Sequence, residues 1–179
     1  YGTALGVIRT AYKNGLLEKI YASETRPWLQ GSRLTSWELE QDNIPVSLLI
    51  DSAVSNLMQK EKISWLIVGS DRITANGDIA NKIGTYSHAV AAKYHNVKVM
   101  VVAPSSTVDM NIDSGKEIPI EYRPIKEITC LNKEKQAPNQ TEIFNPAFDI
   151  TPASLIDFIV TEKGIINEPN AKKMHAFFG

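Results

Sequence analysis

Apolar segments of strand length alternate with amphipathic helical segments from the start of this chain to Ala103. The strand candidates are nearly uninterrupted apolar runs, as expected for strands that are buried on both faces of a parallel sheet. Alternation of this kind favours an α/β fold, Rossmann-like, with a mostly parallel, doubly wound sheet. The predicted strands cover residues 19–23, 45–50, 65–68 and 97–103.

Apolar residues at intervals of three and four predict the helices between these strands. One helix is in pattern by Ala4 and stops at Gly15, and a second covers residues 33–40. Asp51 is expected to be the N-cap of a third. After a turn at Asn76-Gly77 a fourth helix is expected. Its inward residues are predicted to be Ile79, Ile83, Tyr86, Val90 and Tyr94.

The last third of the chain has a less regular pattern. Short strands are expected over 118–120 and 128–131, and the polar stretch 132–140 predicts an exposed loop. Thr151-Pro152 is typical of a helix start, with Thr as the N-cap. A final strand is predicted over 158–161. Because no repeat, linker or low-complexity tract divides the sequence, residues 1–179 are predicted to form one domain.

Composition excludes several classes of partner. With 19 Lys and Arg against 20 Asp and Glu, the chain has no basic surplus for nucleic acid. No apolar run approaches the roughly 20 residues of a membrane helix, so no membrane partner is expected. The single cysteine, Cys130, rules out an internal disulfide and fits a reducing compartment, which predicts a cytoplasmic protein. The chain lacks a start methionine, and we expect it to be part of a longer protein whose N-terminal domain is absent.

Polar clusters follow three of the predicted strands, at the sheet edge where α/β folds bind ligands. Their Arg, Lys, Asn and Gln side chains, together with free helix N-termini, suit a phosphorylated small molecule. The glycine spacing matches neither a Walker loop nor a dinucleotide fingerprint, so a nucleotide site is not supported. The clusters cover residues 24–35, 69–82 and 103–109.

Each candidate residue also has a purely structural interpretation. Asp71 could be a turn former after a strand, Lys82 a solvated helix lysine and Gln30 a structural loop residue. Cys130, in an apolar context, is expected to be a packed thiol. No metal site is predicted, because the histidines lie far apart in sequence without Cys or carboxylate companions. They are His88, His95 and His175.

A string of short motifs distinguishes between these interpretations. The motifs are Glu24-Thr25-Arg26-Pro27, Gly31-Ser32-Arg33-Leu34-Thr35-Ser36-Trp37-Glu38-Leu39, Val68-Gly69-Ser70-Asp71-Arg72-Ile73, Asn76-Gly77-Asp78, Asn81-Lys82-Ile83-Gly84-Thr85-Tyr86, Ala103-Pro104-Ser105-Ser106, Gly115-Lys116-Glu117-Ile118-Pro119-Ile120-Glu121 and Phe144-Asn145-Pro146-Ala147-Phe148-Asp149-Ile150-Thr151-Pro152. In this order and spacing they resemble the S-methyl-5-thioribose-1-phosphate isomerase family. The resemblance runs from Tyr1 to about Gly164.

The resemblance implies an aldose–ketose isomerase of methionine salvage that converts 5-methylthioribose 1-phosphate to the ribulose 1-phosphate. It implies Asp71 as the catalytic acid. It implies Gln30, Asn81 and Lys82 as ligands of the substrate's phosphate and hydroxyls. No cofactor is implied, because the hydrogen moves within the sugar. An Asp that donates a proton near pH 7 needs a raised pKa, which burial would supply.

The resemblance also implies that part of the site is missing. The family's cysteine belongs to a segment just upstream of the motif at Tyr1, and Cys130 does not match it. We therefore expect the 179-residue chain to fold alone, with an open crevice at Asp71, and to be inactive or nearly so. Water in the crevice would return the pKa of Asp71 toward about 3.9.

Two other functions stay open within the same superfamily. Ribose-1,5-bisphosphate isomerase performs similar chemistry, and the regulatory subunits of the exchange factor for translation initiation factor 2 bind without chemistry. The Asp71-Arg72 and Arg33-Leu34-Thr35 segments argue against a regulatory subunit. The resemblance further implies a homodimer, to which the apolar segment 144–158 could contribute. Alternatively its apolar residues are ordinary core: Phe144, Phe148, Ile150, Leu155 and Ile156.

Overall fold

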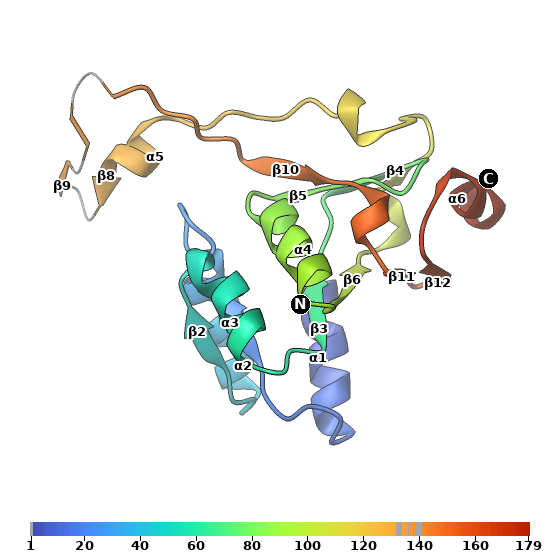
Figure 1. Cartoon of the computed structure of the whole chain (residues 1–179), viewed down its shortest axis with the longest axis horizontal. Helices are drawn as coiled ribbons and strands as arrows, with labels where there is room; N and C mark the ends of the chain where they lie inside the picture. Colours follow the sequence, from blue (N-terminus) through green and yellow to red (C-terminus); the bar gives the residue numbers. More distant parts are fainter. Residues whose placement is uncertain (1, 132–133, 136, 139–140) are drawn as a thin grey trace.

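A computed structural model describes residues 2–131, 134–135, 137–138 and 141–179 (Figure 1). The predicted exposed loop over 132–140 therefore lies mostly outside the described residues. Within that stretch a short strand, β9 (Glu134–Lys135), pairs antiparallel with β8 (Cys130–Leu131).

The central sheet has four strands in the order β12–β11–β6–β3. β3, β6 and β11 are parallel, and β12 returns antiparallel to β11. Its strands are β3 (Trp65–Val68), β6 (Lys98–Val102), β11 (Phe158–Thr161) and β12 (Gly164–Asn167). The predicted strands at 65–68, 97–103 and 158–161 are confirmed. Val99, Val101 and Ile159 are buried in the core that this sheet shares with its covering helices.

A second parallel pair, β1 (Tyr21–Ser23) with β2 (Ser47–Leu49), forms a sheet of its own in the described chain. The α/β class is confirmed, but the parallel strands are divided between two sheets. Strands predicted as buried are therefore partly open: Leu48 is 49% exposed and Trp65 is 41% exposed. Both β2 and β3 are edge strands within the described residues, which leaves one flank of each without a neighbouring strand.

Helices lie beside these sheets (Figure 1). The prediction of helices near 4–15, 33–40 and after Asp51 is confirmed, with a π-helical turn over Gly31–Thr35 ahead of the second and a 3-10 turn over Asp51–Ala53 ahead of the third. The observed helices are α1 (Thr3–Lys13), α2 (Ser36–Gln41), α3 (Val54–Lys60), α4 (Thr85–Tyr94), α5 (Lys126–Thr129) and α6 (Ala171–Phe178). The sequence patterns did not predict α6, β12 or β7.

A mixed sheet that the sequence did not predict carries the second polar cluster. Its order is β10–β5–β4–β7, with β5 antiparallel to both neighbours and β7 parallel to β4. The strands are β4 (Arg72–Thr74), β5 (Ile79–Lys82), β7 (Val108–Asp109) and β10 (Phe148–Thr151). The predicted Asn76-Gly77 turn joins β4 to β5, with Gly77 at φ 89°.

The predicted helix beginning at Ile79 is wrong in its start and in its buried face. Ile79 lies in the interior strand β5, and α4 begins only after Gly84, whose φ of 104° marks the change of backbone conformation. The face of α4 that is buried carries Thr85, Ala89 and Ala92. The residues predicted to point inward are exposed: Tyr86, Val90 and Tyr94. The apolar spacing spanned a strand and a helix, and so mixed two periods.

Three further local predictions are corrected. Asp51 makes no N-cap hydrogen bond to α3, because its carboxylate binds another loop. Thr151 ends β10, and only a short 3-10 turn over Ala153–Leu155 follows it. In place of two short strands, residues 118–120 have no regular structure and 126–129 form α5, with only Cys130–Leu131 in a strand. The described residues 118–131 and 141–147 extend from the body as a long arm (Figure 1).

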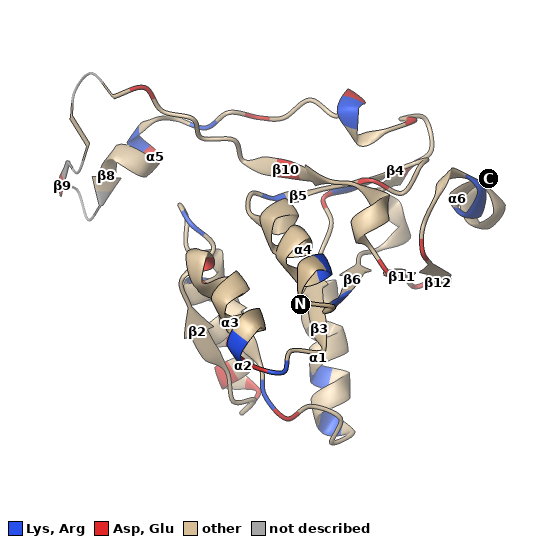
Figure 2. Ribbon diagram, in the orientation of Figure 1, with Lys and Arg blue, Asp and Glu red and all other residues tan. Residues whose placement is uncertain are grey.

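Acidic and basic residues are interspersed along the ribbon (Figure 2). Among the described residues, no helix combines the length and the apolar character that crossing a membrane would require. Of the apolar residues in 144–158, Ile156 is buried in the core and Phe144 is 74% exposed. The segment is therefore only partly core.

Asp157 ties β6 to the start of β11 and gives a test of the fold. Its carboxylate accepts hydrogen bonds from Lys98 Nζ at 2.7 Å and from the Val99 N–H at 2.8 Å. Burial alone would raise the pKa of Asp157, but these donors hold it below its ordinary value. The stabilisation is therefore present above the unfolded pKa and is lost as pH falls through the folded one. We predict that Asp157→Asn lowers the free energy of unfolding by about 1 to 2 kcal/mol at pH 7, and by less at pH 3. Urea unfolding at the two pH values measures this, and an equal loss at both would contradict the assignment.

Candidate functional site

A cavity of 330 Å³ opens at the carboxyl ends of β3 and β6. Gly69 and Ser70 follow β3, and Ala103 and Pro104 follow β6, as the carboxyl-edge rule predicts. Gln30 comes from the loop before α2. All three polar clusters identified in the sequence therefore meet at this cavity, together with the first residues of α1.

A second cavity, of 270 Å³, also includes Gln30 in its wall. Lys82 and Phe148 line it from β5 and β10, and the Lys82 Nζ lies 4.8 Å from the centre of the Phe148 ring. Arg123, on the arm, also lines this cavity and pairs with Glu121 at 3.1 Å and Glu127 at 2.9 Å. The structure thus brings Gln30 and Lys82 into one wall, whereas Asp71 and Asn81 line neither cavity.

The Gln30 side chain is held with an unused acceptor. Its Oε1 is buried without a hydrogen-bond partner among the described residues. A buried oxygen that stays unpaired costs about 1 to 3 kcal/mol, which a bound donor would recover. Next to it, Gly31 is required by space: a Cβ there would lie 1.7 Å from the Ser23 carbonyl oxygen. The loop is therefore packed tightly against β1 while the amide of Gln30 remains available.

Asn81 and Lys82 end β5 where the chain turns into α4. Asn81 Nδ2 donates to the Thr85 hydroxyl at 2.9 Å, and this hydroxyl donates to the Lys82 carbonyl oxygen at 2.7 Å. Both side chains are half-buried. These bonds close the turn on itself, so the two predicted ligands are presented from an ordered backbone.

Asp71 lies beside this turn. Its N–H donates to the Ala80 carbonyl oxygen at 2.9 Å, which places it next to Asn81 across the β4–β5 hairpin. The side chain is exposed in this chain. Even so, partial burial raises the pKa of Asp71, and the positive charge of Lys82 opposes that rise. The expectation that an open crevice returns the pKa to its ordinary value is therefore wrong, because the surrounding protein still removes part of the carboxylate's hydration.

Sequence reasoning gave no role to the residues that hold these segments. Asp149 binds the backbone where α4 starts, and Asp51 binds the backbone before Gln30. The sequence signals were a local helix-start pattern at Asp51 and the place of Asp149 within the motif over 144–152. Among the residues described, no group of His, Cys, Asp and Glu is placed to hold a metal ion, and Cys130 is a half-buried free thiol.

The fold and the polar crevice are those of a Rossmann-like domain with a small-molecule cavity at its carboxyl edge. The chain belongs to the initiation factor 2 subunit family, whose model matches residues 2–168. It is 59% identical over 176 residues to a methylthioribose-1-phosphate isomerase of Pseudomonas aeruginosa, covering 98% of this chain and 49% of that protein. The resemblance found in the motifs is thereby confirmed.

Solved structures agree with this relationship. The 5-methylthioribose 1-phosphate isomerase from Pyrococcus horikoshii OT3 superposes with a TM-score of 0.95 at 42% identity, covering 99% of this chain and 49% of that one. Subunit delta of translation initiation factor eIF-2B from A. fulgidus matches with a TM-score of 0.90 at 44% identity, over 98% of this chain and 52% of that one. The chain spans about half the length of the curated relatives it matches.

The charge of Lys82 gives a direct test of the geometry at Asp71. Removing a nearby cation disfavours an ionised carboxyl group. We therefore predict that Lys82→Met raises the pKa of Asp71 further, as followed by carbon-13 NMR titration of its carboxyl group. Lys163→Met, which removes a lysine over Phe178 instead, should leave this pKa unchanged. An unchanged or lowered Asp71 pKa in Lys82→Met would contradict the electrostatic contact.

Proposed function

We propose that the protein to which this chain belongs converts 5-methylthioribose 1-phosphate to 5-methylthioribulose 1-phosphate in methionine salvage. The observation that carries this proposal is the 59% identity to the P. aeruginosa isomerase across 98% of the chain. Gln30 and Lys82 line a cavity that suits a phosphate ester, and Asn81 and Asp71 lie beside Lys82 at the β4–β5 hairpin.

The chemistry requires an acid. A ribose whose anomeric oxygen carries phosphate cannot open its ring as a free sugar does, so the ring oxygen must be protonated before hydrogen moves from C2 to C1. Asp71 is the proposed donor, and burial raises its pKa in the direction that this role needs. Lys82 and Asn81 would bind the phosphate and hydroxyls, and the unpaired Gln30 Oε1 would accept from a hydroxyl. Oxidation and reduction balance within the sugar, so no redox cofactor is needed.

The 179-residue chain alone is proposed to be inactive or nearly so. It spans about half of its relatives, and the Asp71 side chain is exposed to water. In the whole protein, further cover over the crevice would raise the Asp71 pKa beyond the rise already present. Weak binding through Gln30, Asn81 and Lys82 is the most that the chain should give.

Two alternatives are considered, and one of them has support from a solved structure. The A. fulgidus match favours a non-catalytic initiation-factor subunit, because its identity of 44% is similar to that of the P. horikoshii isomerase. A ribose 1,5-bisphosphate isomerase would use the same acid on a sugar with a second phosphate. The curated relatives at 56% to 60% identity are named methylthioribose-1-phosphate isomerases, which favours the thioether sugar.

We also propose that the whole protein is a cytoplasmic homodimer. The arm bears exposed aromatic side chains, among them Tyr122 and Phe144. The centroids of these two rings are 5.5 Å apart, and the residues are 63% and 74% exposed. Exposed aromatic pairs of this kind are typical of surfaces that become buried in a protein–protein interface. Phe144 belongs to the segment that the sequence suggested for an interface.

Asp71→Asn in the full-length protein tests the catalytic proposal. We expect kcat to fall by about 10²- to 10⁴-fold, because an amide cannot donate the proton for ring opening. Asp113→Asn, which changes an exposed carboxylate elsewhere, should leave turnover unchanged. Product can be followed as the ketose by NMR, with the 179-residue chain as a further arm that should form none. Near-normal turnover by Asp71→Asn would show that Asp71 is not the catalytic acid. Robust turnover by the chain alone would show that the upstream segments are dispensable.

The homodimer is tested by placing a charge on the arm. We predict that Phe144→Asp shifts the full-length protein toward monomer in sedimentation equilibrium at micromolar concentration, because a buried carboxylate at an interface is unfavourable. Leu16→Asp, at a residue that is 73% exposed in the loop after α1, is the matched control. A wild-type protein that sediments only as monomer would contradict the proposal.

A further inference from the structure

We propose that two carboxylates outside the assigned site, Asp149 and Asp51, are positioning residues that hold its two substrate-binding segments in place. Asp149 fixes the turn that presents Asn81 and Lys82, and Asp51 fixes the loop that presents Gln30. This inference rests on the proposed isomerase function and adds to it the residues that set the geometry of the site.

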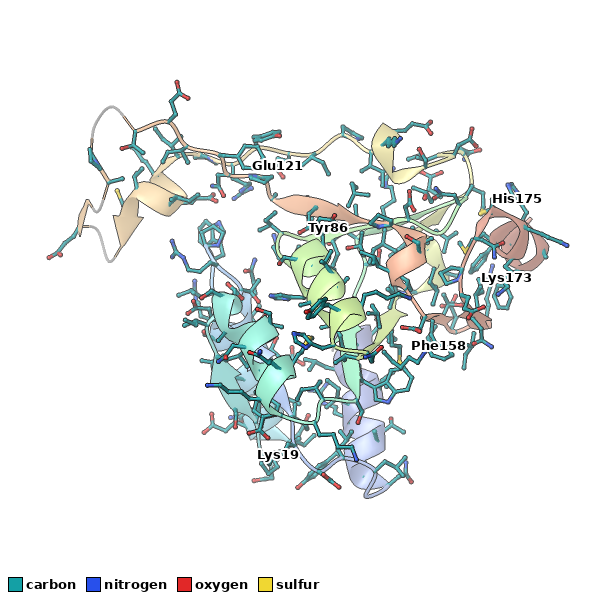
Figure 3. The ribbon with its side chains drawn as sticks, viewed as in Figure 1. Lys19, Tyr86, Glu121, Phe158, Lys173 and His175 are labelled. Atoms are coloured by element: carbon teal, nitrogen blue, oxygen red, sulfur yellow. The ribbon has the colours of Figure 1, made fainter. Side chains whose placement is uncertain are left out.

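Asp149 lies on β10 directly opposite Asn81 in the β10–β5 register. Its Oδ2 accepts from the Gly84 N–H at 2.7 Å, and its Oδ1 accepts from the Tyr86 N–H at 3.0 Å. Tyr86 lies in the first turn of α4, next to β10 (Figure 3). Both carboxylate oxygens are therefore bound to the first N–H groups of α4, immediately after Lys82.

The charge of Asp149 suits this position. The first N–H groups of a helix have no partner within the helix and carry partial positive charge, so a carboxylate there is stabilised. Burial raises the pKa of Asp149, and the Gly84 and Tyr86 N–H groups and His88 oppose that rise. Without the carboxylate, two N–H groups would be unpaired and the Asn81–Lys82 turn would lose its attachment to β10.

Asp51 makes the same kind of attachment on the other side of the site. Its Oδ1 accepts from the Thr25 N–H at 2.8 Å, and its Oδ2 accepts from the Arg26 N–H at 2.7 Å. Thr25 has φ 65° and Leu29 has φ 59°, a conformation that non-glycine residues rarely adopt. Such backbone persists only when surrounding contacts enforce it. Asp51 supplies such a contact at Thr25, in the loop that leads to Gln30, and its carboxylate is therefore not available to cap α3.

His88 connects the two attachments. It lies on α4 beyond Tyr86 and is half-buried. Burial lowers the pKa of His88, while a hydrogen bond with the Asp51 backbone and the charges of Asp51 and Asp149 oppose the fall. The charges of both carboxylates therefore act on the same imidazole.

Ordinary stabilisation is the competing explanation, and the chain contains a matched control for it. Asp157 also binds with both oxygens, to Lys98 Nζ and the Val99 N–H, but at the amino end of the central sheet, away from the cavity at the carboxyl ends. If carboxylate attachments act only on stability, substitutions at Asp149, Asp51 and Asp157 should have the same kinetic signature.

The experiment measures KM and kcat for 5-methylthioribose 1-phosphate in the full-length protein carrying Asp149→Asn, Asp149→Ala, Asp51→Asn or Asp157→Asn. Hydrogen bonds to a charged group correspond to roughly 10-fold or more in binding. We expect KM to rise roughly 10-fold or more in Asp149→Ala, less in Asp149→Asn, which keeps one acceptor oxygen, and clearly in Asp51→Asn. Loss of binding contacts raises KM with little change in kcat, whereas a lower folded fraction reduces kcat alone. Asp157→Asn should therefore lower thermal stability without changing KM.

Amide hydrogen exchange gives a readout independent of turnover. Exchange at Gly84 and Tyr86 should accelerate in Asp149→Asn, and exchange at Thr25 and Arg26 should accelerate in Asp51→Asn. An unchanged KM in folded Asp149 variants, or an equal KM rise in Asp157→Asn, would overturn the positioning role. A wild-type protein with no turnover would instead remove the proposed function, and with it the substrate on which this inference depends.

Discussion

The antiparallel pairing of β10 with β5 is the contact on which the site depends. It joins two segments that are far apart in the chain and places Phe148 opposite Lys82 and Asp149 opposite Asn81. The pairing is anchored by side chains with no exposure to water, since Ile79 and Thr151 are both completely buried where the strands meet. This strand pair holds the Asn81–Lys82 turn in place, and Asp149 on β10 also binds the start of α4.

The parallel part of the fold follows from local sequence, whereas the mixed sheet does not. Apolar runs predict β3 and β6 because strands buried between helices need few polar residues. The carboxyl-edge rule then predicts that Gly69, Gln30 and Ala103 meet, as the larger cavity shows. Ile79 was assigned to a helix because its partner, β10, is supplied by a distant segment that no local window contains.

The errors at Asp51 and Asp71 have a related origin. Asp51 precedes a helix, and Asp is a residue type that commonly caps one. Its carboxylate instead accepts hydrogen bonds from two backbone N–H groups of the 24–35 loop. For Asp71 the sequence placed the residue correctly after a strand and misjudged its electrostatics. A side chain can be exposed on one side and still lose hydration to the protein on the other, so its pKa rises against the pull of Lys82.

We propose that these residues serve an isomerase acting on a ribose 1-phosphate with a neutral thioether at C5. The most direct measurement supplies the full-length protein with 5-methylthioribose 1-phosphate and, separately, ribose 1,5-bisphosphate, each labelled with carbon-13 at C2, and follows the appearance of a ketone carbon. We expect a ketone signal from the thioether sugar and little or none from the bisphosphate. Conversion of the bisphosphate alone would contradict the assignment of the thioether sugar as the substrate. Conversion of neither sugar would contradict the assignment of isomerase activity.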